Sequence, residues 1–469
     1  MTEANEYNVI LVVLDTVRAK QLGLYGRDID PMPNLSEFSE DATVFERAYT
    51  NAPWTLPAHA SLFTGKLPSE HGCHGGSLGF TTDHQALAEA FSNLGYRTYG
   101  VSNNIWISDH FEFDDGFDEF YKEWQLFRST REIGHISREK ERDLTTSDLI
   151  KKLLRGNPLI NVTNGLYAKF LYRRNDFGGK RTTRHLSSLV NDASEPFFLF
   201  VNYMEGHAPF IEHNCTSKFV PEEIDNIDRY TDLSGSSLEY HVGDTEISDA
   251  EFDIMESLYD GELNYLDCQL GRLFEAVRDD GQLSDSIVVI VGDHGENIGD
   301  HGLMAHRFSV HDTLLHVPLV IRHPEYGRGV RVADPVDFRD LYQWLTSDPS
   351  QTSPTTLPSE GPIVAEYLST EATPEIRYDS FEFEGSEYDR RKIAVLNDEH
   401  KLIVSDDGTA QLYEYGGCPD FEINGEQITD PHVKSRLREF CTGFDWEETR
   451  TVDERDTVKE HLKKLGYMD

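Results

Sequence analysis

The sequence predicts an α/β fold in which a large, mostly parallel central sheet is flanked by helices. Three runs of residues that are apolar except for Ser286 lie at residues 9–14, 197–201 and 286–291. Uninterrupted runs of this kind are typical of strands that are buried on both faces of a parallel sheet. Helix-like stretches separate these strands along the chain, which is the alternation of an α/β layer structure.

The other expected elements follow in chain order. Helices are expected from residue 33 and over residues 85–94 and 253–277, and further strands over residues 97–102 and 317–321. The long helix keeps one apolar stripe, because its leucines recur at spacings of three and four. Pro318 lacks the N–H that an interior strand donates, so it indicates a strand start or an edge position.

The 469 residues are long enough for a large domain and a smaller one. Residues 1–346 are expected to form the α/β domain, with a helical insertion at about 130–194. Residues 347–362 are rich in Ser, Thr and Pro and are expected to be a linker. Residues 363–469 are expected to form a small α+β subdomain with a short antiparallel sheet. Its expected elements are strands at 392–396, 401–404 and 411–415 and a closing helix at about 453–465.

The chain is strongly acidic, with 84 Asp and Glu against 43 Lys and Arg and a formal net charge of −41. Such a charge argues against binding to nucleic acid or to anionic lipid as a main activity. The acidic residues are spread along the whole chain, which is typical of adaptation to high salt, where screening removes the self-repulsion.

We therefore expect a high-salt organism as the source, and unfolding of the protein at low salt. The physical reason is that dilution of salt restores repulsion among the surface carboxylates. Thermal unfolding over a series of salt concentrations measures the effect. Full stability without added salt would contradict it.

The N-terminal residues 1–7 are polar and acidic, and the apolar run that follows them is too short for a signal peptide or a membrane span. The five cysteines contain no C-x-x-C pair and indicate neither a zinc ribbon nor a disulfide framework. A cytoplasmic protein without stable membrane insertion is expected.

Thr55 begins the segment that we expect to carry the chemistry. Pro57 suits the first turn of a helix, where its missing N–H costs nothing. Thr55 then lies at the helix N-terminus, where free backbone N–H groups and the helix dipole favour an anion or an alkoxide. The segment is also consistent with Thr55 as an N-cap and His59 as a surface residue, since Thr is a common cap.

Polar side chains follow all three buried strands. Asp15 ends the first strand, His207 comes shortly after the second, and Asp293 and His294 follow the third. Because the carboxyl ends of parallel strands meet at one edge of a sheet, these groups are expected to converge. Two carboxylates and an imidazole are a plausible ligand set for a divalent cation. A hydroxyl beside that cation would have a lowered pKa and attack as an alkoxide.

Each of these groups also has a simpler interpretation. Residues 15–16 favour the turn that follows a strand, and residues 293–296 can form a capped turn. A single histidine such as His207 or His306 is more often structural. The pattern Asp-His-Gly-Glu directly after an apolar run is the denser signal, and it favours the metal site.

Several segments, taken in order, resemble the sulfatase family within the alkaline phosphatase superfamily. The resembling segments are residues 8–18, 33–35, 45–49, 55–65, 202–210, 292–302 and 317–319. Together they extend over most of residues 8–345. The resemblance implies an alkaline-phosphatase-like sandwich and a substrate-binding role for His207. The metal ligands that it implies are Asp15, Asp293, His294 and Thr55.

The departures from the family pattern bear on the chemistry. Classical sulfatases have Cys or Ser in place of Thr55 and oxidise that residue to formylglycine. Thr55 carries a methyl group on its β-carbon, so no formylglycine is expected. A Thr nucleophile is the pattern of phosphodiesterases and phosphoglycerol transferases in the superfamily. His59 stands in place of the signature's Arg, His306 in place of a common Lys, and Thr16 in place of a second Asp.

We therefore expect a metal-dependent hydrolase or transferase that cleaves a phosphate or sulfate ester, with phosphoryl transfer favoured. Thr55 is the expected nucleophile, and one divalent ion (Ca, Mg, Mn or Zn) is the expected cofactor. His207 and His306 are expected to bind ester oxygens and to protonate the leaving alcohol, while His59 orients Thr55 or takes its proton. The substrate is expected to be a small-molecule, glycan or lipid ester. The residues expected to line the site are Thr16, Asn103 and Asn104.

Three other functions stay open. The first is a classical, arylsulfatase-like sulfuric ester hydrolase that works without formylglycine. The second is a non-catalytic protein that binds anions or glycans, which the retention of Asp15, Asp293 and His294 argues against. The third is a mutase- or isomerase-like enzyme, but such sites usually hold two metals, and the sequence offers too few further carboxylates for a second ion.

Overall fold

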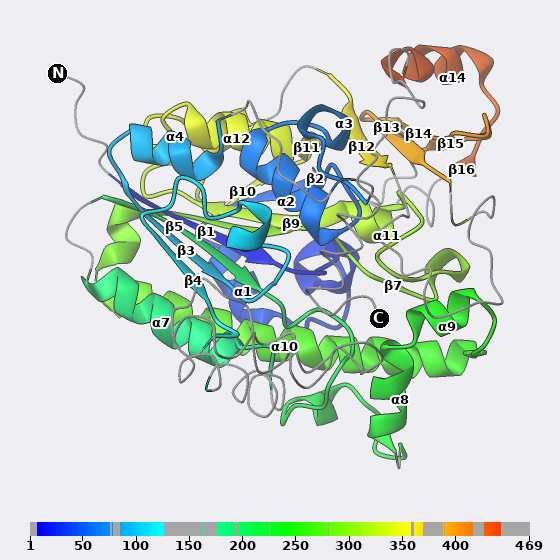
Figure 1. The fold of residues 1–469 in the computed structure, drawn as a ribbon, viewed down its shortest axis with the longest axis horizontal. Coiled ribbons are helices and arrows are strands. Elements are labelled where there is room, and N and C mark those ends of the chain that lie inside the picture. Colours follow the sequence, from blue (N-terminus) through cyan, green and yellow to red (C-terminus); the bar gives the residue numbers. More distant parts are fainter. Residues whose placement is uncertain are drawn as a thin grey trace, which may run out of the picture.

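The computed structural model describes residues 7–75, 77, 85–125, 163, 176–192, 196–224, 226–279, 281–357, 361–368, 388, 390–415 and 426–441. Most of the expected insertion at 130–194 and the helix expected over 453–465 lie outside these residues. Figure 1 shows a central sheet between layers of helices, with a second, smaller sheet to one side. None of the helices in the described ranges combines the length and the apolar character that a membrane span requires.

Nine strands of the described residues form the central sheet, in the order β10-β2-β9-β6-β1-β5-β3-β4 with β11 beside β2. They are β1 (Asn8–Leu14), β2 (Thr43–Tyr49), β3 (Arg97–Ser102), β4 (Glu119–Lys122), β5 (Phe197–Tyr203), β6 (Ser286–Gly292), β9 (His316–Arg322), β10 (Val330–Val332) and β11 (Val336–Asp337). The adjacent strands β5, β1 and β6 are parallel, and Leu14 pairs with both Tyr203 and Gly292. These three strands therefore end level with one another at one edge, which confirms the mostly parallel sheet.

Helices cover both faces of this sheet. Successive side chains of β1 alternate between two cores, with Leu11 in one and Val12 in the other. One core includes α2 (Thr55–Thr64), α4 (Leu87–Asn93) and α12 (Phe338–Thr346), and the other includes α1 (Pro33–Ser39), α7 (Gly179–Asp192) and α10 (Asp249–Asp279). Figure 1 shows α4 and α12 on one side of the sheet and α7 and α10 on the other. Burial on both faces explains why the strands are continuously apolar.

The long helix expected over residues 253–277 is confirmed as α10, which spans Asp249–Asp279. Its leucine stripe, from Leu263 to Leu273, is buried against the sheet. Further short helices are α3 (Pro68–His71), α8 (Ile227–Ser234), α9 (Ser237–His241) and α11 (Asp312–Leu315).

Pro318 lies near the start of its strand, as one of the two expected positions has it, but inside the sheet rather than at its edge, which corrects the other. Its strand, β9, runs between β2 and β6 and is antiparallel to both. The register of β2 against β9 shifts between Phe45 and Ala48, which face Leu319 and Val317. Pro318 therefore lies opposite a bulge, which is one of the positions where an interior strand tolerates a residue without an N–H.

The smaller sheet is antiparallel, as expected. Among the described residues it consists of β12 (Ile363–Tyr367), β13 (Lys392–Leu396), β14 (His400–Ser405), β15 (Ala410–Glu414) and β16 (Glu426–Gln427), with α14 (Pro431–Arg438) nearby. Lys401 of β14 forms a fully buried ion pair with Asp312 of α11. Lys392 of β13 donates to the carbonyl oxygen of Phe308 at 2.5 Å. Through these two contacts, Phe308 and Asp312, which follow β6 in the chain, bind to the smaller sheet.

Candidate active site

The two carboxylates of the site follow the ends of neighbouring strands. The backbone N–H of Asp15 continues the ladder by donating to Tyr203 (2.9 Å), and that of Asp293 donates to Leu14 (3.2 Å). Asp15, Asp293 and His294 are fully buried, and one ligand atom from each lies within 4.8 Å of the others. The edge formed by β1 and β6 therefore brings together three of the four groups that the sequence placed after buried strands.

Each carboxylate has one satisfied and one unsatisfied oxygen. Asn104 Nδ2 donates to Asp15 Oδ2 at 2.6 Å, and Asp293 Oδ1 accepts from the backbone N–H groups of Thr16 (3.0 Å) and His294 (2.7 Å). Within the described residues, Asp15 Oδ1 and Asp293 Oδ2 are buried without a hydrogen-bond partner. Buried charges are normally paired or coordinate a metal, so these two oxygens fit a divalent cation.

The pKa values of the two carboxyls also favour a bound divalent cation. Burial raises the pKa of Asp15 to about 7, and the amide of Asn104 offsets only part of that rise. Burial, and then the neighbouring charge of Asp15, raise the pKa of Asp293 well above its usual range. A divalent cation between two such groups neutralises their repulsion. Two carboxylate oxygens and one imidazole nitrogen suit Mg²⁺, Mn²⁺, Ca²⁺ or Zn²⁺.

We expect a divalent cation to stabilise the protein more at pH 8 than at pH 5. Without a cation, the folded protein keeps carboxyl protons that the unfolded chain has released, so its stability falls as the pH rises from 3.8 to about 7. A bound cation favours the ionised carboxylates and removes that loss. Thermal unfolding of chelated and Mn²⁺-loaded protein at both pH values measures the difference. An equal or larger cation effect at pH 5 would contradict it.

Thr55 lies at the start of α2 and faces this group. The helix begins at Thr55, with the extended residue Trp54 as its N-cap, and all ten of its residues are buried. The Thr55 side chain therefore does not cap the helix, and His59 is not at the surface, which rules out the simpler interpretation of the segment. Thr55 Oγ1 lies 3.1 Å from His294 Nε2.

The ring of His294 has a defined tautomer. Its Nδ1 lies 2.9 Å from the carbonyl oxygen of Gly295, which can only accept, so Nδ1 carries the hydrogen. Burial lowers the pKa of His294 well below its usual range, and the ring is neutral. The lone pair on Nε2 is thus directed at Thr55 and the two carboxylates, which is the arrangement of a metal-binding imidazole.

His59 lies one turn after Thr55 on α2. Its Nδ1 donates to the backbone carbonyl of Thr55 at 2.9 Å and lies 3.5 Å from Asp293 Oδ2. The ring is packed edge-on against Phe113 and Phe200, and burial lowers its pKa to about 4. His59 therefore holds the backbone of Thr55 rather than its hydroxyl.

Two further histidines complete one side of the site. The ring centroid of His306 lies 4.6 Å from that of His294 and 5.1 Å from that of His207. His207 Nδ1 donates to the carbonyl of Ala208 at 2.5 Å. The structure therefore places three imidazoles from separate segments next to one another.

Thr16, Asn103 and Asn104, which were expected to line the site, make different contacts. Thr16 has a left-handed backbone (φ 58°), its hydroxyl donates to the carbonyl of Asp15, and only its N–H holds Asp293. Such a conformation is strained for a β-branched residue, and strain of this kind clusters at functional sites. Asn104 contacts the Asp15 carboxylate, whereas Asn103 accepts from Thr182 of α7 at 3.0 Å.

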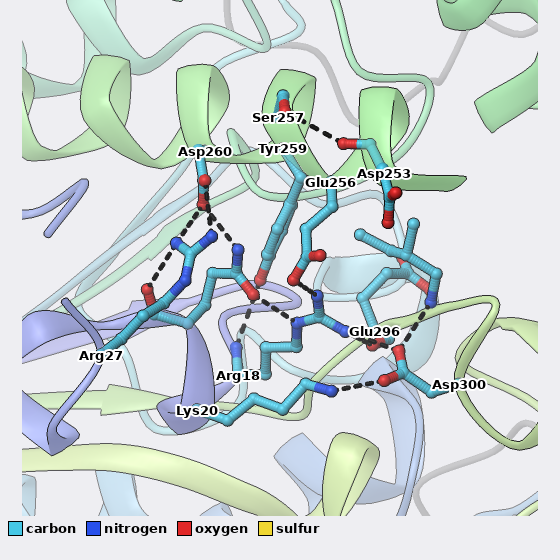
Figure 2. Close-up of polar contacts among 12 residues, drawn as sticks. Arg18, Lys20, Arg27, Asp253, Glu256, Ser257, Tyr259, Asp260, Glu296 and Asp300 are labelled. Atoms are coloured by element: carbon cyan, nitrogen blue, oxygen red, sulfur yellow. Dashed lines mark hydrogen bonds and ion pairs between the residues drawn. The ribbon is translucent and has the colours of Figure 1, made fainter. Parts of the chain in front are cut away.

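Arg18 has no role in the sequence interpretation, yet it ties the loops after β1 and β6 together (Figure 2). Its guanidinium is buried and pairs with Asp300 (2.7 Å) and Glu256 (2.9 Å). It also donates to the carbonyl oxygen of Glu296 at 3.1 Å. The sequence shows an arginine after a buried strand, but its partners come from distant segments and could not be inferred.

Glu296 is the second residue that sequence reasoning left without a role. It is 1% exposed, and its Oε2 lies 3.3 Å from His306 Nδ1. Burial raises the pKa of Glu296 to about 8 and lowers that of His306 to about 3. The contact joins the Glu296 carboxyl to Nδ1 of His306 and leaves Nε2 on the other side of the ring. Glu296 is part of the Asp-His-Gly-Glu pattern, but the pattern does not indicate which residue it contacts.

Comparison of the sequence with known proteins gives the sulfatase family, and comparison of the structure gives a shared fold. The sulfatase family profile matches residues 7–343. The uncharacterized sulfatase YidJ of Escherichia coli (strain K12) is 24% identical over 369 residues, which cover 75% of this chain and 70% of that protein. Arylsulfatase K of Bos taurus is 22% identical over 460 residues, which cover 92% and 80% of the two chains. The phosphonate monoester hydrolase of Agrobacterium radiobacter has a similar fold, with a TM-score of 0.66 and 16% identity over 98% of this chain and 97% of that one.

The family match agrees with the geometry of the site. Enzymes of the sulfatase family use a divalent metal, and Asp15, Asp293 and His294 are a possible ligand set for one. The matched residues include all three groups and Thr55, and they make up more than half of the chain. The chain therefore belongs to the sulfatase family, whose members are ester hydrolases.

Proposed function

We propose that this enzyme is a metal-dependent hydrolase or transferase that cleaves a phosphate or sulfate ester with Thr55 as its nucleophile. The observation that carries the proposal is the position of Thr55 Oγ1, 3.1 Å from His294 Nε2 and beside two buried, unsatisfied carboxylate oxygens. A non-catalytic protein has no need to bury Asp15 and Asp293 next to each other, because the two charges oppose folding unless an ion lies between them.

Each residue of the site has its own role in the proposed reaction. Asp15, Asp293 and His294 would hold the ion, which lowers the pKa of a neighbouring hydroxyl and offsets charge on the ester. Thr55 releases its hydroxyl proton to solvent, and its Oγ1 forms a bond to phosphorus or sulfur while the bond to the leaving oxygen breaks. His306 and His207 bind the anionic oxygens, whose negative charge raises the pKa of His306 and favours its protonated ring. The leaving oxygen then takes a proton from Nε2 of that imidazolium, which returns to the neutral imidazole. Water or an acceptor alcohol then displaces Thr55.

The unmodified threonine favours phosphoryl over sulfuryl transfer. A formylglycine adduct can break down by elimination, but Thr55 has no second hydroxyl on its β-carbon, so its adduct must be displaced. The relatives of this chain include sulfatases, so hydrolysis of a sulfate ester is the second candidate function and is included in the test. The substrate class proposed is a small-molecule, glycan or lipid ester.

A panel of aryl phosphate, phosphodiester, phosphonate and sulfate esters tests the proposal. We expect turnover of at least one class, lost on chelation and restored by one of Mg²⁺, Mn²⁺, Ca²⁺ or Zn²⁺, with phosphorus esters turned over faster than sulfate. Turnover that resists chelation would contradict the metal, and faster turnover of sulfate would favour the second candidate. Turnover of none of the four classes would contradict the proposal.

A further inference from the structure

We propose that Glu296 is a positioning residue that holds His306 in place as the proton donor to the leaving alcohol. The inference rests on the proposed function and adds to it a residue with no ligand role at the metal. It stands on the contact between Glu296 Oε2 and His306 Nδ1, at 3.3 Å, between side chains that are 1% and 13% exposed.

The backbone of Glu296 is held by Arg18. Its carbonyl oxygen accepts from the guanidinium of Arg18, which is itself paired with Asp300 and Glu256 (Figure 2). A buried residue that is held on both its backbone and its side chain has little freedom to move. Glu296 therefore offers a rigid support for a neighbouring ring.

A short hairpin brings His306 onto that support. β7 (Asn297–Ile298) pairs with β8 (Met304–Ala305), and Asn297 Nδ2 donates to the carbonyl of Ala305 at 2.9 Å. Ala305 has a left-handed backbone (φ 64°), as does Phe308 (φ 70°), so His306 lies between two strained turns. Non-glycine residues adopt this conformation only where the surrounding structure requires it. The hairpin thus directs the His306 ring at the Glu296 carboxyl.

The contact also sets which ring atom faces the reaction. Nδ1 and Nε2 lie on opposite sides of an imidazole, so pairing of Nδ1 with Glu296 turns Nε2 away from that carboxyl. The rings of His294 and His207 lie 4.6 and 5.1 Å from that of His306. Without Glu296 the His306 ring can rotate, and the proton on Nε2 loses its alignment with the leaving oxygen.

The test compares leaving groups, because a proton donor matters most for a poor leaving group. The wild type is first assayed on a 4-nitrophenyl ester and on an alkyl ester of its best class. Glu296→Ala is expected to lower turnover of the alkyl ester at least about tenfold more than that of the 4-nitrophenyl ester. Glu296→Asp, which keeps a carboxyl but shortens its reach, is expected to do the same. Glu296→Gln, which can still pair with Nδ1, is expected to restore the wild-type ratio.

A double-mutant cycle with His306→Ala identifies the route of the effect. If Glu296 acts through His306, Glu296→Ala changes the leaving-group ratio no further in the His306→Ala background. Glu256→Gln is the matched control. That carboxylate also pairs with Arg18, but in the described part of the structure it makes no hydrogen bond to His306, so the ratio is expected to stay at its wild-type value. Metal content of each variant is measured in parallel.

The outcomes separate this inference from the proposed function. Absence of chelator-sensitive turnover in the wild type would overturn the proposed function and the inference with it. Normal wild-type turnover, with equal losses on both esters in Glu296→Ala and Glu296→Asp, would overturn the positioning role alone. A further change in the ratio when Glu296→Ala is added to His306→Ala would also overturn it.

Discussion

Substitution of Thr55 by valine is expected to lower turnover of every accepted ester by about 10³- to 10⁶-fold. Valine keeps the branched shape of threonine and replaces only the hydroxyl, so the buried start of α2 stays packed. That hydroxyl lies 3.1 Å from His294 Nε2, and its removal leaves the ester without a nucleophile. Initial rates at saturating metal, with and without chelator, measure the loss.

Two further variants show whether the loss belongs to the hydroxyl of Thr55. Thr55→Ser keeps a hydroxyl and is expected to retain chelator-sensitive turnover. Ser61→Ala is the matched control, because Ser61 lies on the same helix with its Oγ 3.1 Å from a histidine, His71, outside the site. Its turnover is expected to stay within about threefold of wild type. If Thr55→Val keeps more than a tenth of wild-type activity, Thr55 is not the nucleophile, and water is the group that attacks the ester.

Asp293→Asn is expected to abolish the stabilisation by divalent cations and to lower turnover at least about 100-fold. The substitution keeps Oδ1, which accepts from the backbone of Thr16 and His294, and changes only the unsatisfied Oδ2. It also removes one of two buried like charges, so the chelated variant is expected to melt at least about 2 °C above the chelated wild type. Thermal unfolding with and without cation measures both effects.

Asp260→Asn is the matched control for Asp293→Asn. Asp260 is a buried carboxylate on α10 that pairs with Arg27 at 2.6 Å (Figure 2). Its loss leaves Arg27 without that partner, so the variant is expected to be less stable with and without cation alike. An Asp293→Asn protein that still responds to cations, or that melts below the wild type after chelation, would refute the metal-ligand assignment.

The frame of the site could be predicted from the sequence because it depends on strand ends. Apolar runs that are buried on both faces identify β1, β5 and β6 without ambiguity, and parallel strands end at one edge. Asp15 and Asp293 follow two of these runs directly, so their proximity follows from topology alone. The position of Thr55 at a helix start likewise follows from Pro57 and needs no knowledge of distant contacts.

The remaining parts of the site depend on contacts between distant segments. Asn103 and Asn104 are equivalent in the sequence, and only the course of the chain after β3 brings Asn104 to Asp15. Glu296 meets His306 because a hairpin with left-handed residues reverses the chain, and such residues carry no signal when they are not glycine. The strand β2 was missed because Glu46 and Arg47 interrupt its apolar pattern at the bulge.

The mass of the peptide that carries Thr55, from protein quenched during a single turnover, tests the central claim most directly. With enzyme in excess of ester, we predict that this peptide transiently carries one phosphoryl or sulfuryl group on Thr55, which disappears as the acceptor displaces it. The same peptide from Thr55→Val protein is expected to stay unmodified. Release of the alcohol in that single turnover, with Thr55 unmodified at every quench time, would contradict the account.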